Sequence, residues 1–175
     1  MAIKINGTEL KYKILHNGGK LKTAYHNGET LLWRAEKYIF QNGVLESGVT
    51  LNNIDLGTTL YRQAYAEWVD DVDTILVEIE GIDLTDYSKM DIELNYNSHA
   101  DYGETSVSCG IDGYSNKELP KTTNINGTPA TVTIDISSYT GKHFVGFRLY
   151  ARNDSSAESL HAWATIWIKS IRLYN

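Results

Sequence analysis

The residues best suited to binding chemistry occupy alternate positions in two stretches of alternating polarity. Because side chains alternate between the two faces of a β-strand, one stretch presents Glu93, Asn95 and Asn97 together, and the other presents Arg148 and Tyr150 together. Carboxylate, amide and guanidinium groups hydrogen-bond to vicinal hydroxyls, and an aromatic ring stacks on the flat C–H face of a sugar. We therefore expect these five residues to bind a carbohydrate. An ordinary solvated face with a Glu93–Arg148 cross-strand pair is the alternative.

The two stretches form one face only if they belong to the same sheet. Asn-Gly and Asp-Gly turn dipeptides divide the chain, and no window has the 3.6-residue period of a helix. Eight stretches have the two-residue period of strands: 37–41, 59–65, 74–80, 90–97, 105–111, 130–136, 143–151 and 160–173. This pattern predicts an all-β sandwich of two antiparallel sheets with jelly-roll connections. In a jelly roll the second, seventh, fourth and fifth strands lie side by side, which would also bring Ser106 and Ser108 to the face.

The opposite faces of these strands are apolar and predict the core. They comprise Ile75, Val77, Ile79, Met90, Ile92, Leu94, Val107, Cys109, Ile111, Val132, Ile134, Ile136, Val145, Phe147, Leu149, Ile166 and Ile168. Since Cys109 falls in this set, we expect a buried, unreactive thiol. A single Cys also excludes a disulfide within the chain and a thiolate-rich zinc site. The last strand changes face near Lys169 and Ser170, which predicts a β-bulge.

The chain divides into two parts by charge and by turn spacing. Residues 1–35 carry six Lys or Arg and two Glu, and their closely spaced Asn-Gly turns predict a small β-meander. Residues 36–175 carry ten basic and twenty acidic side chains and form the sandwich. An acidic body argues against nucleic acid as a partner, and no apolar run reaches the ~20 residues of a membrane span. The meander is expected to cover the outward-facing Trp163 and Trp167; an aromatic ligand platform is the alternative.

Catalytic and metal-binding motifs are absent from the sequence. His99 and Asp101 could act as a base and its partner, but a single His without a placed substrate group is usually a surface residue. The cluster Asp70, Asp71 and Asp73 could ligate calcium, but it lacks the ligand spacing of an EF-hand, so we expect a solvated loop. We expect no catalytic residue, no metal site and no cofactor, and therefore a binding protein and not an enzyme.

Two segments resemble known families. Residues 5–7 (ING) and 22–33 (KTAYHNGETLLW) resemble a repeat of tail and baseplate-associated proteins from phages of Gram-positive bacteria. The body resembles jelly-roll carbohydrate-binding modules, and the matching segments are 38–43 (YIFQNG), 134–141 (IDISSYTG), 144–148 (FVGFR) and 168–174 (IKSIRLY). This second resemblance implies that the last strand pairs with the first, which would place Ile171 and Leu173 near Ile39.

The resemblances imply a non-enzymatic phage-tail-type protein that recognises host-surface carbohydrate. The chain starts without an apolar signal segment, so we expect synthesis in the bacterial cytoplasm without a signal peptide and exposure on the virion after assembly. The alternative is a structural tail assembly protein that forms a homo-oligomer, or contacts other tail proteins, without binding glycan.

Overall fold

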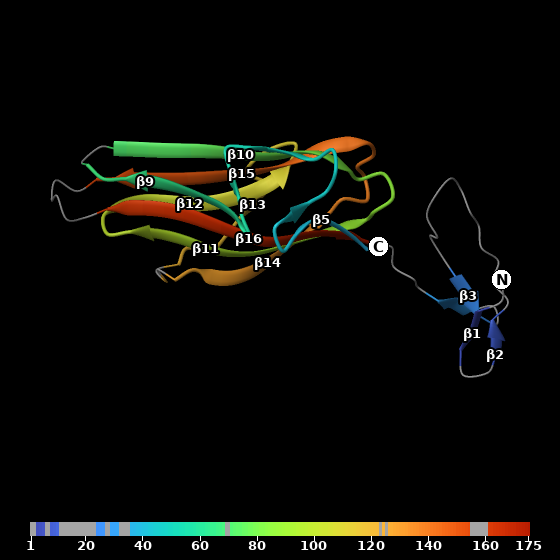
Figure 1. The fold of residues 1–175 in the computed structure, drawn as a ribbon. Coiled ribbons are helices and arrows are strands. Elements are labelled where there is room, and N and C mark those ends of the chain that lie inside the picture. Colours follow the sequence, from blue (N-terminus) through green and yellow to red (C-terminus); the bar gives the residue numbers. More distant parts are fainter. Residues whose placement is uncertain are drawn as a thin grey trace.

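Figure 1 shows the computed structural model, which describes residues 36–68, 71–122, 124, 126–154 and 161–175 throughout. Within residues 1–35 it describes only the backbone of four short strands. These strands lie in the segment where the N-terminal meander is predicted and form two separate antiparallel pairs: β1 (Ile3–Ile5) with β2 (Thr8–Leu10), and β3 (Ala24–His26) with β4 (Glu29–Leu31). The domain boundary at residue 35 stays a prediction.

The remaining strands form an all-β sandwich of two antiparallel sheets, which confirms the predicted fold class (Figure 1). The five-stranded sheet has the order β13-β12-β15-β10-β7. Its strands are β7 (Thr50–Asn52), β10 (Asp71–Asp83), β12 (Gly103–Ile111), β13 (Lys117–Glu118) and β15 (Lys142–Asn153). The seven-stranded sheet has the order β14-β11-β16-β5-β6, with β9 also paired to β16 and β8 to β9. Its strands are β5 (Lys37–Gln41), β6 (Val44–Leu45), β8 (Asp55–Leu56), β9 (Leu60–Ala66), β11 (Lys89–Ala100), β14 (Thr128–Asp135) and β16 (Ala162–Tyr174).

The connections are those of a jelly roll, but the assignment of strands to sheets differs from the prediction. If β5 is the first strand, the second, seventh, fourth and fifth strands are β10, β15, β12 and β13, and these lie side by side. The sequence pattern led us to number 59–65 as the second strand and to miss β13, which has only two residues. The stretch 90–97, in β11, is therefore the third strand and belongs to the other sheet.

The long strand β16 holds the seven-stranded sheet together. It pairs with β11 along its whole length, and on its other edge with β9 as far as Ile168 and with β5 from Ser170 onward. Glu93 pairs with Ser170 while Leu94 pairs with Ile168, so Lys169 is the extra residue of a β-bulge. This confirms both the predicted bulge and the expected pairing of the last strand with the first.

The predicted inward faces form the core. All of the predicted core residues are buried except Ile75 and Ile134, which are partly buried and pack against the cluster. Cys109 is fully buried among them, and burial raises the pKa of its thiol to about 11. Helices are absent from the part of the chain that the structure describes, so no segment there could cross a membrane as a helix.

The burial of Cys109 predicts its reactivity. A thiol reagent at pH 8 should not modify the native protein, because both the inaccessibility and the raised pKa keep the thiolate away from the reagent. One thiol should react in full when the chain is unfolded in urea. Rapid modification of the native protein would contradict the placement of Cys109 in the core.

Candidate functional site

The five residues predicted to bind ligand lie on two different sheets. Arg148 and Tyr150 belong to β15, whereas Glu93, Asn95 and Asn97 belong to β11 in the opposite sheet. They do not share a face, and the alternative Glu93–Arg148 cross-strand pair is excluded for the same reason. The cause is that 59–65, which is β9 at the edge of β16, was counted as the second strand, and this shifts β11 from third to fourth place in the jelly-roll order.

The amides of β11 are covered by a neighbouring loop. Asn97 is fully buried, and its Nδ2 donates a hydrogen bond of 2.9 Å to the carbonyl oxygen of Asn124. Gly127 lies against Asn95 and Trp167 so closely that a Cβ there would stand 3.2 Å from each side chain. Because Asn124 and Gly127 lie over this part of the sheet, a ligand cannot reach Asn97 without moving them, and Asn95 is only partly exposed.

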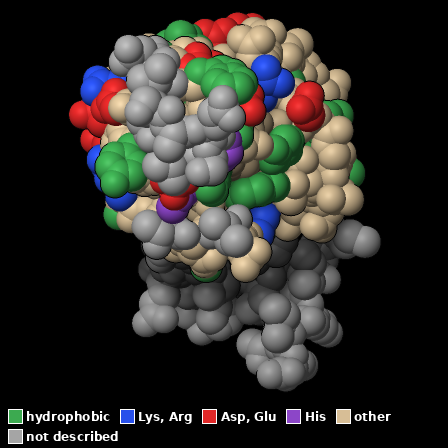
Figure 2. All heavy atoms as spheres, turned by 90° about the vertical axis from the view of Figure 1, so that its left-hand side faces the viewer, with side chains coloured by type: hydrophobic (Ala, Val, Ile, Leu, Met, Phe, Trp, Pro, Cys, Tyr) green, Lys and Arg blue, Asp and Glu red, His purple; other side chains and the backbone are tan. Residues whose placement is uncertain are grey.

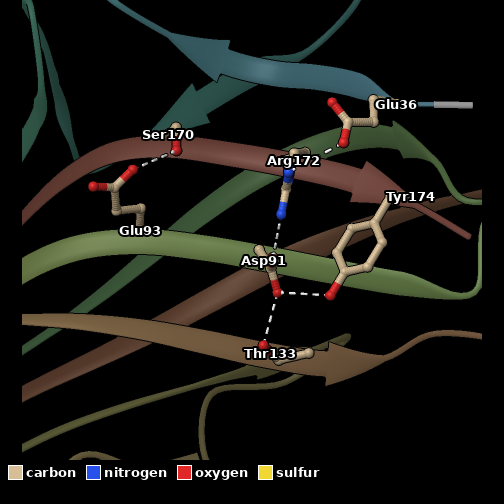
Figure 3. A network of polar contacts seen from close by, with 7 residues as sticks. All are labelled: Glu36, Asp91, Glu93, Thr133, Ser170, Arg172 and Tyr174. Atoms are coloured by element: carbon tan, nitrogen blue, oxygen red, sulfur yellow. Dashed lines mark hydrogen bonds and ion pairs between the residues drawn. The ribbon is translucent and has the colours of Figure 1, made fainter. Parts of the chain in front are cut away.

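Glu93 borders a network of ion pairs and hydrogen bonds on the same sheet (Figure 3). Its carboxylate accepts a 3.3 Å hydrogen bond from the Ser170 hydroxyl. The neighbouring Asp91 accepts hydrogen bonds from Arg172 at 2.7 Å, from Thr133 at 2.7 Å and from Tyr174 at 3.1 Å. Burial would raise the pKa of Asp91, but these three donors together outweigh it and lower the pKa. The network joins β14, β11 and β16, and its groups are engaged with one another.

Trp163 and Trp167 pack against side chains of neighbouring strands. Trp167 lies 5.8 Å from the Tyr61 ring, and Trp163 lies 4.4 Å from the His99 ring, centroid to centroid. Cross-strand aromatic pairs of this kind stabilise a sheet. The predicted cover by residues 1–35 would depend on side chains outside the described residues; Trp167 is in any case covered in part by Gly127.

The remaining sequence candidates gather at one end of the sandwich, where Figure 2 shows apolar and His side chains together. The ring of His99 lies 2.9 Å from the carboxylate of Asp101, which also accepts the backbone N–H of His161. Asp71 and Asp73 lie in β10 and not in the predicted loop, and both accept backbone N–H groups. Asp70 lies outside the described residues. Over the described ranges, no three His, Cys, Asp or Glu side chains are grouped to hold a metal.

The outer face of the five-stranded sheet is half covered by the loop of residues 112–116. Two glycines permit this contact: a Cβ on Gly146 would stand 2.3 Å from the Gly113 oxygen and 2.7 Å from the Tyr114 ring, and one on Gly110 would stand 2.3 Å from the Asn116 side chain. Ser108 donates a 2.6 Å hydrogen bond to the Tyr114 carbonyl oxygen. The loop therefore forms a wall across the face.

Tyr114 is also anchored through its hydroxyl, which donates a short hydrogen bond to Glu78. That bond lowers the pKa of Glu78 and raises the pKa of Tyr114. The Tyr114 ring lies 5.9 Å from the Phe144 ring. The wall is thus held by packing, by a backbone contact and by a carboxylate.

The other half of this face is open, and it holds the two predicted residues that share a strand. The Arg148 guanidinium lies 5.2 Å from the centre of the Tyr150 ring. In the sheet register Tyr150 lies between Thr74 and Ser106, and Arg148 lies between Leu76 and Ser108. Leu76 is 40% exposed. We call this half the open strip. It runs from Leu76 and Arg148, next to the wall, to the C-terminal end of strand β15.

Comparisons with known proteins give only distant matches. No protein-family model and no curated protein matches the chain. One similar solved structure is TmCBM61 in complex with beta-1,4-galactotriose, with 12% identity, a TM-score of 0.37, and coverage of 80% of this chain and 86% of that chain. Another is the non-crystalline cellulose specific carbohydrate-binding module CBM28, with 9% identity, a TM-score of 0.28, and coverage of 79% and 86%. These scores are too low to carry function across, so function has to be inferred from the residues of this chain.

The contact between the wall and the sheet should depend on the absence of a side chain at Gly146. Gly146→Ala places a methyl group where the loop backbone lies, so we expect the free energy of unfolding to fall by about 1–3 kcal/mol. Gly113→Ala in the same loop is the control, because its nearest neighbour would be at an ordinary 3.5 Å. Equal urea denaturation midpoints for the two variants would contradict the described contact.

The Asp91 network should contribute to stability. Asp91→Asn removes the charge that Arg172 contacts, and we expect a loss of about 1–3 kcal/mol at pH 7. Because the pKa of Asp91 is lower in the folded protein than in the unfolded chain, where it is about 4, the carboxylate stabilises the fold above that pH. The difference in the free energy of unfolding between wild type and Asp91→Asn should therefore become smaller as the pH falls below about 4. Asp55→Asn, at a side chain 71% exposed, should change stability little. A pH-independent difference would contradict a charge effect.

Proposed function

We propose that this chain is a non-catalytic carbohydrate-binding module and that the open strip holds its ligand. The observation that carries the proposal is the arrangement of Tyr150 and Arg148 beside the hydroxyls of Thr74 and Ser106. An aromatic ring and a planar polar group on a flat strand surface suit the C–H faces and hydroxyls of a sugar. The wall at Tyr114 gives the strip a closed end.

The charges of the strip suit binding better than proton transfer. Its carboxylate, Glu104, stands opposite Arg152 in the sheet register. Arg152 in turn makes two 2.7 Å hydrogen bonds to Asp154. A general acid or base has to reach the proton it transfers, and here the acidic groups are directed to a neighbouring arginine.

We further propose that the glycan belongs to a bacterial surface and that the chain acts in a phage tail, exposed on the virion. This part of the proposal is supported by the resemblance of residues 5–7 and 22–33 alone. Identification of tail genes beside the gene of this chain would support it, and a gene neighbourhood without any phage genes would contradict it.

The binding proposal is tested by calorimetry with cell-wall polysaccharide, after a glycan array has chosen the ligand. Tyr150→Ala should weaken binding at least about tenfold through loss of the stacking surface, with an unchanged melting temperature. Tyr38→Ala is the control, since Tyr38 is a 40% exposed tyrosine on the opposite sheet. Equal affinities of the two variants for the glycan would contradict the proposal that the ligand binds at the open strip.

A second candidate function is structural assembly. Trp68 and Tyr102 are 57% and 62% exposed at the end of the sandwich seen in Figure 2, and exposed aromatic groups often mark subunit contacts. Analytical ultracentrifugation separates the two functions. A stable oligomer that dissociates in Trp68→Ser would favour assembly, and a monomer that binds glycan would favour the module.

A further inference from the structure

Arg148 differs from the other described arginines in having no acidic partner among the residues that the structure describes. Arg62, Arg152 and Arg172 each have a carboxylate oxygen within 4.0 Å, from Asp55, Asp154, and both Glu36 and Asp91 respectively. The one contact of Arg148 among the described residues is the face of the Tyr150 ring. A guanidinium without an acidic partner among the described residues therefore lies at the end of the open strip next to the wall.

The acidic groups near Arg148 are engaged elsewhere. Across the sheet Arg148 stands between Leu76 and Ser108, which carry no charge. Glu78, the next outward residue on β10, accepts hydrogen bonds from Tyr114 and from Asn52. Glu104 stands opposite Arg152. No carboxylate of the strip is thus directed at the Arg148 guanidinium.

We propose that Arg148 makes the open strip selective for anionic glycans, in which a sugar carries a carboxylate or phosphate group; this inference rests on the proposed function. A guanidinium presents a planar fork of N–H donors that matches two oxygens of such a group. Its position over Tyr150 restricts the side chain before the ligand arrives, which lowers the entropy lost on binding.

A neutral ligand fits this site less well for an energetic reason. Any glycan stacked on Tyr150 takes water away from the adjacent guanidinium, and a desolvated charge without a counter-charge is costly. An anionic group on the ligand supplies the missing partner. The neighbouring hydroxyls of Thr74 and Ser106 remain available to the sugar hydroxyls.

The overall charge of the chain makes the selectivity testable. Residues 36–175 carry ten basic and twenty acidic side chains, and an acidic protein does not attract polyanions in general. Residues 1–35 carry six Lys or Arg and two Glu, so binding of a polyanion reports the local site only where Arg148→Gln weakens it.

The experiment is isothermal titration calorimetry with polygalacturonate and with its fully methyl-esterified form, which keeps the sugar and removes the charge. A phosphomannan, whose sugars carry phosphate, distinguishes phosphate from carboxylate as the recognised group. We expect the acid form to bind at least tenfold more tightly than the ester. Arg148→Gln should weaken binding of the anionic ligand about 10–100-fold, the loss expected for hydrogen bonds to a charged group.

Two further variants sharpen the test. Arg148→Lys keeps the charge but loses the fork, so its affinity should lie between wild type and Arg148→Gln. Lys142→Gln removes a cation of the same strand that stands opposite Asp83, and it should not change affinity. Melting temperatures of all variants should equal that of the wild type, since the Arg148 side chain is exposed.

The outcomes separate this inference from the proposed function. Binding of either anion, with loss in Arg148→Gln, supports the inference. Equal binding of the acid and the ester, or binding of neutral glycans that Arg148→Gln leaves unchanged, overturns it while the carbohydrate-binding function stands. Absence of binding to every charged and neutral glycan overturns both.

Discussion

The close approach of the loop 112–116 to Gly110 and Gly146 is the contact on which the account depends. The outer face of β12, β15 and β10 would otherwise be a continuous surface. Two missing Cβ atoms let the loop backbone and Tyr114 lie directly on it. The face is thereby divided into a covered half and the open strip. This division decides which outward residues of β15 meet solvent as a ligand surface and which are part of the wall.

The jelly-roll pairing gives that contact a rigid base. β15 is central in its sheet, bonded to β10 on one side and β12 on the other. Its inward residues Val145, Phe147 and Leu149 are fully buried in the core. Since the strand cannot shift its register without exposing these side chains, Gly146, Arg148 and Tyr150 are held at fixed positions on the outer face.

The opposite sheet carries more aromatic rings, but its rings and polar side chains already contact one another. Trp163 stacks with His99 and Trp167 with Tyr61, and the polar groups around Asp91 are engaged with one another (Figure 3). A side chain whose hydrogen bonds are already made gains little from a ligand. The open strip has fewer aromatic groups, but its Arg148 has no carboxylate partner among the described residues and can contact a ligand.

Strand alternation was sufficient to predict the core, the buried Cys109 and the bulge at Lys169, because each depends on a local two-residue period. It was not sufficient to assign the predicted ligand-binding residues to the correct sheets. Residues 59–65 have the same two-residue period as a jelly-roll strand, and counting them as the second strand moved Glu93, Asn95 and Asn97 to the wrong sheet. β13 has two residues and no periodicity to detect. The burial of Asn97 beside Asn124, and the wall at Tyr114, depend on loops that fold back on sheet faces. A single sequence has no local signal for such contacts; only Gly110 and Gly146, two glycines on neighbouring strands, hinted at one.

The most direct test of the central claim is a map of the ligand on the protein, obtained by NMR from backbone amide shifts during titration with the glycan that binds. The backbone amides whose shifts change should lie along the open strip, at residues 72–76, 104–106 and 148–152. The amide shifts of β11 and β16 should change little. Perturbations centred on Glu93, on the Trp163–Trp167 ladder or at the end of the sandwich near Tyr102 would contradict it.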